Sequence, residues 1–243
     1  TWTTGTHYIK IPVGTGGADN GLGIATAFDS NNDGIVDTIY AGDLKGNVWK
    51  FDVSNSNPAL WKVATTGDVP LYQASTRLTG TTTTVLQPIT TAVMPFRHPD
   101  GGFQLVFGTG KSLESIDYPM SAPYQNTVYG LHDRIGNTTT ITVGTTDLVI
   151  KSTTFVTVNG VNIRYVENNT VDYTSKKGWF INLSVSSEAV VFNPLVFGSR
   201  EISFRSIAPS GASDGCRVAE VAYDLNLNVI SGSPLTTRIE GAP

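Results

Sequence analysis

The chain has 243 residues, of which only 15% are charged, and its formal net charge is -4. So little positive charge does not favour binding to nucleic acid or to an anionic membrane surface. No apolar run approaches the roughly 20 residues of a transmembrane helix, and no signal-like segment opens the sequence. We therefore interpret the chain as a mature form or an excised piece.

The composition favours strands and turns. Threonine, valine and glycine are frequent, and long stretches lack a helical period. Strand candidates recur between turn signals at residues 7–13, 22–28, 38–42, 47–53, 88–96, 103–108 and 127–133. Spacing this regular predicts antiparallel sheets and an all-β fold.

Residues 29–37 read DSNNDGIVD and place three carboxylates and an amide around one glycine. Ca²⁺ takes about six to eight oxygen ligands, and a tight turn can supply them from alternate side chains and a carbonyl. Gly34 stands where the backbone must turn sharply. The sequence therefore predicts a calcium site with ligands from Asp29, Asn31, Asp33, the carbonyl of Ile35, and Asp37.

The predicted calcium loop is not the helix-flanked form, because Tyr40 stands where that form needs an acid, and both flanks are strand-like. An ordinary hairpin turn at the Asn-Asp-Gly sequence is the alternative. Such a turn does not need Asp29 and Asp37, however. Without a cation, three like charges this close would also repel one another.

One sequence unit recurs along the chain. Residues 39–52, and then 105–111 with 128–133, each read as a strand, a glycine turn and an aromatic strand that ends in aspartate, which is typical of a propeller blade. Further strand segments lie at residues 177–183, 188–194, 202–209 and 217–225, which brings the count to three to four blade-like units in all. Three to four units are too few for a closed ring of about 4 to 8 blades, so we expect the N-terminal blades to lie outside this chain.

Residues 40–52, YAGDLKGNVWKFD, resemble the C-terminal domain of the PilY/PilC family of type IV pilus biogenesis and adhesion proteins. The resemblance continues in the family order through residues 107–111, 125–133, 178–183, 188–194 and 206–216. Residues 138–172 match poorly and include a predicted hairpin that turns at Asn159 and Gly160. We therefore expect this segment to be a variable insertion in one domain spanning residues 1–243.

The resemblance implies a modified β-propeller that is exported to the cell surface, the outer membrane or the pilus tip. It implies that calcium at the 29–37 loop regulates pilus extension against retraction, and hence twitching motility, and supports attachment. The implied partners are pilus components such as minor pilins, with a host or abiotic surface as a further ligand. Asn31 replaces what is often an aspartate in such loops, and no Arg-Gly-Asp sequence is present, so integrin binding is not implied.

No motif for catalysis stands out, and we expect no enzyme activity. A quinone-dependent propeller dehydrogenase is the main enzyme alternative, and a ligand-binding adhesin in which calcium is purely structural is another. The single cysteine, Cys216, is either a free thiol or the partner of a cysteine outside this chain.

Four aromatic residues invite a functional interpretation as a platform for stacking sugars. Aromatic residues that alternate along strands more often pack one sheet against another, and this is the interpretation that we prefer. The residues are Trp49, Phe51, Trp179 and Phe180.

The histidines His7, His98 and His132 are far apart in the sequence, so we expect surface or turn positions rather than a transition-metal site. Asp43 and Asp52 flank a Gly-Asn turn. We expect both to accept hydrogen bonds in turns rather than to bind calcium.

Overall fold

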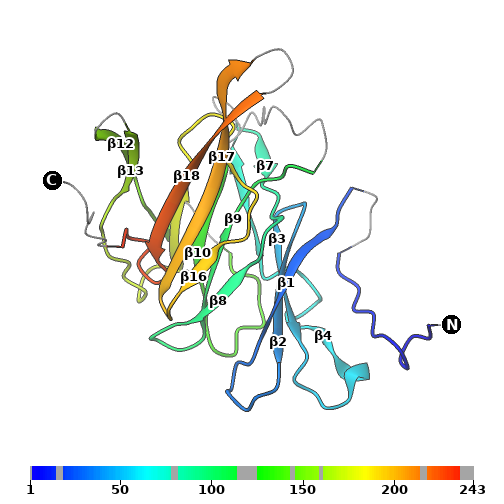
Figure 1. The fold of residues 1–243 in the computed structure, drawn as a ribbon. Helices are drawn as coiled ribbons and strands as arrows, with labels where there is room; N and C mark the ends of the chain where they lie inside the picture. Colours follow the sequence, from blue (N-terminus) through cyan, green and yellow to red (C-terminus); the bar gives the residue numbers. More distant parts are fainter. Residues whose placement is uncertain are drawn as a thin grey trace.

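The structure, a computed structural model, describes residues 2–14, 19–77, 82–113, 125–142, 146–158, 161–213 and 218–235. The all-β prediction is confirmed: the described residues form strands and one short 3-10 helix, η1 (Pro58–Leu60). In this part of the chain, no helix has the length and apolar character needed to cross a bilayer. Three sheets of four or five strands lie side by side across the molecule (Figure 1).

The first sheet contains five strands in the order β1-β2-β3-β4, and β5 also pairs with β3. Their bounds are β1 (Leu22–Phe28), β2 (Thr38–Asp43), β3 (Asn47–Asp52), β4 (Lys62–Val63) and β5 (Tyr72–Gln73). Each pair is antiparallel, and β1, β2 and β3 coincide closely with predicted strands.

The second sheet has the order β11-β14-β10-β9-β8. Its strands are β8 (Met94–Arg97), β9 (Phe103–Gly108), β10 (Thr127–Asp133), β11 (Leu148–Ile150) and β14 (Gly178–Asn182). The pairing is antiparallel except between β11 and β14, which run parallel.

In the third sheet, β15 (Ala189–Val190) and β16 (Leu195–Phe197) pair with β17 (Glu201–Ser213), which also pairs with β18 (Val218–Asn228). Figure 1 shows β17 and β18 as the long orange hairpin. Two further antiparallel pairs stand apart from the three sheets: β6 (Ser75–Arg77) with β7 (Thr84–Leu86), and β12 (Thr153–Val158) with β13 (Val161–Val166).

The alternation of side chains along the strands builds a core on each side of the second sheet. Tyr129 on β10 joins a cluster with Tyr40 of the first sheet, whereas its neighbour Val128 joins a cluster with Ile202 of the third sheet. Successive residues of a strand point to opposite faces, so one strand contributes to both clusters. The second sheet is therefore packed between the other two.

A close approach within the second sheet explains one glycine of the repeated unit. Gly130 lies opposite Trp179 in the β10–β14 ladder, and a Cβ at position 130 would meet the Trp179 indole at 2.2 Å. Only glycine leaves room for this ring, because any other residue carries a Cβ.

Two predicted strands are wrong or too long. Residues 7–13 form no strand: Tyr8 makes only an isolated bridge to Thr4, while Ile11 and Val13 pack against the outer cluster of the first sheet. The apolar alternation there reflects packing without a backbone ladder. The strand predicted at 88–96 begins only at Met94, after a segment in which Ile89 makes a single bridge.

The segment predicted to be an insertion, residues 138–172, contributes to more than one sheet. Its strand β11 joins the second sheet, and β12 and β13 form the predicted hairpin, whose turn at Asn159 and Gly160 lies outside the described residues. Cys216 also lies outside them. The variability of this segment and the state of the cysteine stay predictions.

Candidate functional site: the 29–37 loop

The 29–37 loop connects β1 to β2 and is closed at its base by main-chain contacts. The amide of Asp37 donates to the carbonyl of Phe28 at 3.2 Å. The amide of Ser30 donates to Asp37 Oδ1 at 2.9 Å, and the Asp37 side chain is buried. Asp37 therefore ties the end of the loop to its beginning.

Asp29 lies at the centre of the loop, where the chain turns around its carboxylate. Asp29 Oδ1 accepts from the amides of Asn32 and Asp33 at 2.6 and 3.3 Å, and Oδ2 accepts from Gly34 at 2.8 Å. Burial opposes ionisation, but the amides of Gly34, Asn32, Asp33 and Asn31 outweigh it and hold the pKa of Asp29 below its usual value. Asp29 is therefore negatively charged at neutral pH.

The other predicted ligands follow the same pattern of side chain to backbone contacts. The amide of Asp33 donates to Asn31 Oδ1 at 2.8 Å, and the amide of Ile35 donates to Asp33 Oδ1 at 2.8 Å. Asn31 Nδ2 also donates to Asp33 Oδ2 at 3.1 Å. The loop thus brings all five predicted ligands into one short turn, with the side chains of Asn31 and Asp33 exposed to solvent.

The donor set fits calcium in type, because the five ligands offer only carboxylate, amide and carbonyl oxygens. Within the described residues, no three aspartate, glutamate, histidine or cysteine side chains converge closely enough to hold a metal. The loop therefore has the right chemistry for calcium, while its three carboxylates stay apart in this structure.

Arg97, on β8 of the second sheet, holds the loop from outside. Its Nη1 donates to the carbonyl of Ser30 at 3.1 Å, and its Nη2 donates to Asn32 Oδ1 at 2.6 Å. Its guanidinium also lies 5.7 and 5.9 Å from the ring centroids of Phe28 and Phe103. No local pattern indicates this contact, because Arg97 is far from the loop along the chain.

Asp43 and Asp52 do not contribute to the loop, and their predicted role as turn acceptors is confirmed. Asp43 Oδ1 accepts from the amides of Lys45 and Asn47, both at 2.9 Å, and Asp43 Oδ2 accepts from Trp49 Nε1 at 2.9 Å. Asp52 Oδ1 accepts from the amide of Ser54 at 3.0 Å.

The packing role predicted for the aromatic residues is confirmed for three of the four. Trp49, Phe51 and Trp179 are buried in the clusters on the outer face of the first sheet and between the second and third sheets. Phe180 is only partly buried and lines a pocket between the first and second sheets.

The surface or turn positions expected for the histidines are wrong for His98 and His132, which are both buried and stacked with ring centroids 3.7 Å apart. His132 lies opposite Gln104 on β9, and His98 directly follows β8 on the other side of β9. The pairing of three strands brings the rings together. Sequence separation alone could not indicate it.

Two buried ion pairs were also not predicted from the sequence. Lys50 Nζ lies 2.8 Å from Asp133 Oδ2, which also accepts from the Tyr40 hydroxyl at 2.7 Å and so joins the first sheet to the second. Arg164 on β13 makes two 2.7 Å bonds to Glu188, which fixes the β12–β13 hairpin to the third sheet.

Comparison with known proteins agrees with this architecture. The family model described as the PilY1 beta-propeller domain matches residues 3–154. The type IV pilus biogenesis factor PilY1 of Pseudomonas aeruginosa strain PAO1 is 32% identical over 218 residues, covering 75% of this chain and 18% of that protein. A PilY1 homolog of Xylella fastidiosa strain Temecula1 is 29% identical over 206 residues, covering 81% of this chain and 13% of that protein.

A solved structure is similar over almost the whole chain. The crystal structure of the Pseudomonas aeruginosa PilY1 C-terminal domain matches with a TM-score of 0.74 at 26% identity, and the match covers 93% of this chain and 50% of that one. The chain therefore spans half of the solved domain and less than a fifth of the full-length relatives. With three stacked sheets, a matching family model and relatives near 30% identity, the chain belongs to the PilY1 family of type IV pilus biogenesis factors.

Proposed function

We propose that this chain is a calcium-binding part of a type IV pilus biogenesis factor, and that calcium at the 29–37 loop regulates pilus extension and retraction and supports surface attachment. The relatives are named as pilus biogenesis factors, not as enzymes, which supports a role in assembly rather than catalysis. Pilus components such as minor pilins, and a host or abiotic surface, are the partners in this proposal. It places the protein at the cell surface or the pilus tip.

The observation that carries the proposal is the position of the five oxygen donors. The loop that holds them is closed by Asp37 at its base and is held to the second sheet by Arg97. A change in the loop would therefore reach Arg97 directly, and β8 through it. This contact gives the loop a route to influence the surface that the neighbouring sheet presents.

Bound calcium would supply the positive charge that offsets the three carboxylates of the loop. The residues of the chain do the rest: Asp29 and Asp37 fix the ends of the turn, and Asn31, Asp33 and the Ile35 carbonyl complete the oxygen set. At a free calcium concentration one hundred times the Kd, binding would stabilise the folded chain by about 2.7 kcal/mol. That is a large share of a typical stability of about 5 to 15 kcal/mol.

Thermal unfolding with calcium and with a chelator tests the metal assignment. We expect calcium to raise the Tm of the wild-type chain and to leave the Tm of Asp33→Ala unchanged, because the Asp33 side chain is exposed and its loss removes a ligand without opening the core. Asp52→Asn, which alters an acid outside the loop, is the matched control and should keep the calcium response. An equal calcium shift in wild type and Asp33→Ala would contradict the assignment.

The regulatory part of the proposal is tested in cells with the full-length protein. Asp33→Ala is expected to change the amount of surface pili and twitching motility, because the loop would no longer respond to calcium. If cells with Asp33→Ala have normal pili although the purified variant has lost its calcium response, the regulatory role is refuted. Calcium binding by the wild-type loop would then be a structural feature only.

A further inference from the structure

A pocket of about 490 Å³ lies between the first and second sheets, away from the 29–37 loop. Its walls come from residues around β5 and β6 on one side, from β10 and β14 on the other, and from residues 140–142. The volume is within the usual range of about 300 to 1,000 Å³ for small-molecule sites. The pocket shares no residue with the predicted calcium ligands.

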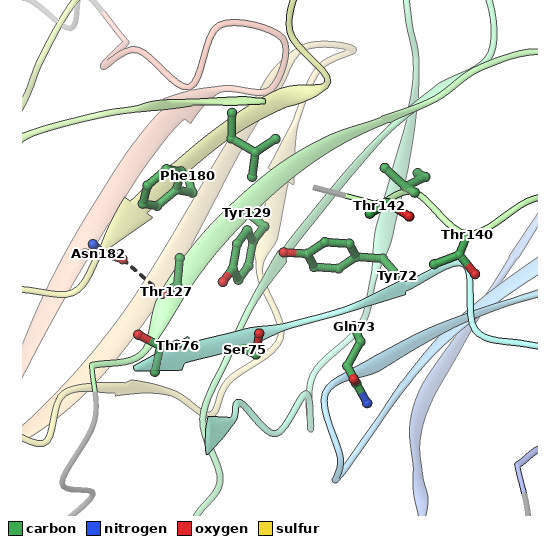
Figure 2. A pocket seen from close by; sticks show the side chains of 12 residues that line it. Tyr72, Gln73, Ser75, Thr76, Thr127, Tyr129, Thr140, Thr142, Phe180 and Asn182 are labelled. Atoms are coloured by element: carbon green, nitrogen blue, oxygen red, sulfur yellow. Dashed lines mark hydrogen bonds between the residues drawn. The ribbon is translucent and has the colours of Figure 1, made fainter. Parts of the chain in front are cut away.

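Three aromatic rings form the inner surface of the pocket (Figure 2). The ring of Tyr129 meets that of Tyr72 edge to face at 5.6 Å, and Phe180 lies beside Tyr129 with ring centroids 6.4 Å apart. Figure 2 shows the hydroxyl of Tyr72 pointing toward Tyr129. Tyr72 and Tyr129 are almost fully buried, so the apolar surface that a ligand can reach is mainly that of the partly exposed Phe180, with Tyr129 packed beside it.

The polar groups of the pocket are neutral and are oriented by a chain of hydrogen bonds. Tyr129 donates to Gln87 Oε1 at 2.7 Å, Gln87 Nε2 donates to Thr127 Oγ1 at 2.8 Å, and Thr127 Oγ1 lies 3.2 Å from Asn182 Oδ1. Burial raises the pKa of Tyr129 to about 12, so its hydroxyl stays neutral.

The side-chain amide nitrogen of Asn182 lies at the end of this hydrogen-bond network. Its Oδ1 faces Thr127, and within the described part of the chain no group accepts a hydrogen bond from its Nδ2. Figure 2 shows the amide nitrogen of Asn182 on the side away from Thr127. The amide can therefore donate to an acceptor on a ligand that reaches the Asn182 edge of the pocket.

This combination selects one class of ligand. Among the described residues that line the pocket, none carries a charge, so a phosphate or carboxylate ligand would lose its hydration without gaining a counter-ion. A lipid chain would bury the hydroxyl and amide groups without partners. A pyranose ring satisfies both requirements, because its C–H face packs on aromatic rings and its hydroxyls pair with amides and hydroxyls.

We propose that this pocket binds a neutral saccharide unit, with Phe180 packing against the sugar face and Asn182 donating to a sugar oxygen. The assignment is independent of the calcium loop. Sugar binding is measured both with calcium and with a chelator. Binding under both conditions would support the sugar site even if the loop binds no calcium, and a missing sugar signal would leave the calcium proposal untouched.

The test is an NMR titration of the isotopically labelled chain with glucose, galactose, mannose and N-acetylglucosamine. Glucuronate serves as the charged counterpart of glucose, and the tripeptide Gly-Tyr-Gly tests the alternative of an aromatic peptide side chain. We expect saturable shifts at the amides of Tyr129, Phe180 and Asn182 with at least one neutral sugar, and weaker binding of glucuronate.

Asn182→Ala and Phe180→Ala are each expected to weaken that binding about fivefold or more, the equivalent of one lost hydrogen bond or packed face. Asn226→Ala, at an exposed position on β18, is the control and should bind as wild type does. If one pocket variant loses its folded spectrum, the other carries the test. The proposal is overturned if no neutral sugar saturates, if only glucuronate or the peptide binds, or if both variants bind the sugar as tightly as wild type.

Discussion

The first and second sheets contain the same sequence unit: a strand, a glycine turn and an aromatic strand that ends in aspartate. The two aspartates nevertheless make different contacts. Asp52, at the end of β3, is half-buried and accepts from the amide and hydroxyl of the exposed Ser54. Asp133, at the end of β10, is fully buried and binds Tyr40 and Lys50 of the first sheet.

The difference arises from the place of each strand in the stack. β10 lies between β9 and β14 within its sheet, and all its residues are buried because the first and third sheets cover its two faces. Asp52 lies toward the outside of the stack, beside the short strand β4. The same motif therefore provides a hydrogen-bond acceptor in a turn at the outside of the stack, Asp52, and a contact between two sheets in the middle of the stack, Asp133.

The largest expected effect comes from removing the buried aspartate. Asp133→Ala should lower the free energy of unfolding by roughly 3 to 5 kcal/mol, because it leaves the Lys50 ammonium, mostly buried, without its counter-ion and the Tyr40 hydroxyl without its acceptor. Urea unfolding followed by tryptophan fluorescence measures the change.

A double variant sharpens this measurement. Lys50→Met added to Asp133→Ala should recover part of the lost stability, because it removes the unpaired charge. A loss below about 1 kcal/mol in the single variant would mean that Lys50 reaches water, and would contradict the role of Asp133 as a joint between the sheets.

The residue before Asp133 gives the next largest effect, on the opposite face of β10. His132 stacks on His98, whose pKa is lowered to about 4 by burial first and by His132, Arg134 and Arg200, while Asp100 opposes the shift. Burial also lowers the pKa of His132. Both rings are therefore neutral in the folded chain at neutral pH.

The sign of the pH effect follows from this lowering. Below the unfolded pKa of about 6.5 the unfolded chain binds a proton that His98 does not bind in the folded chain. Stability therefore falls as the pH drops toward 4, by about 3 kcal/mol from His98 alone. Urea unfolding from pH 7.5 to 4 measures the loss. His98→Gln should make the profile less steep over this range and leave the contribution of His132, and identical profiles for variant and wild type would exclude His98 as a source of the loss.

The strands whose pattern is local were accessible from the sequence. Residues 22–28, 38–42, 103–108 and 127–133 alternate or run apolar between turn signals, and all four appear as strands. The turn role of Asp43 was also accessible, because the amides of Lys45 and Asn47 that donate to its carboxylate lie within the same turn. The oxygen-rich composition of the 29–37 loop was equally local, although its metal stays a prediction.

The contacts between sheets were not accessible, because no local pattern encodes them. Tyr40 and Asp133 are 93 residues apart, and Arg97 is 67 residues from Ser30, whose carbonyl it binds. The pocket was missed for the same reason: its rings come from β5, β10 and β14, and Phe180 was interpreted only as a packing residue. Sequence spacing could identify each strand but not which strands face one another.

The smallest expected effect completes the comparison of the two aspartates. Asp52→Ala should cost less than about 1 kcal/mol, because the amide and hydroxyl of Ser54 that lose their acceptor are exposed and can bind water instead. The same urea unfolding measures it beside Asp133→Ala. Equal losses in the two variants would show that the motif itself, rather than its place in the stack, determines the contribution of the aspartate; a large gap between them assigns that contribution to the sheet that covers Asp133.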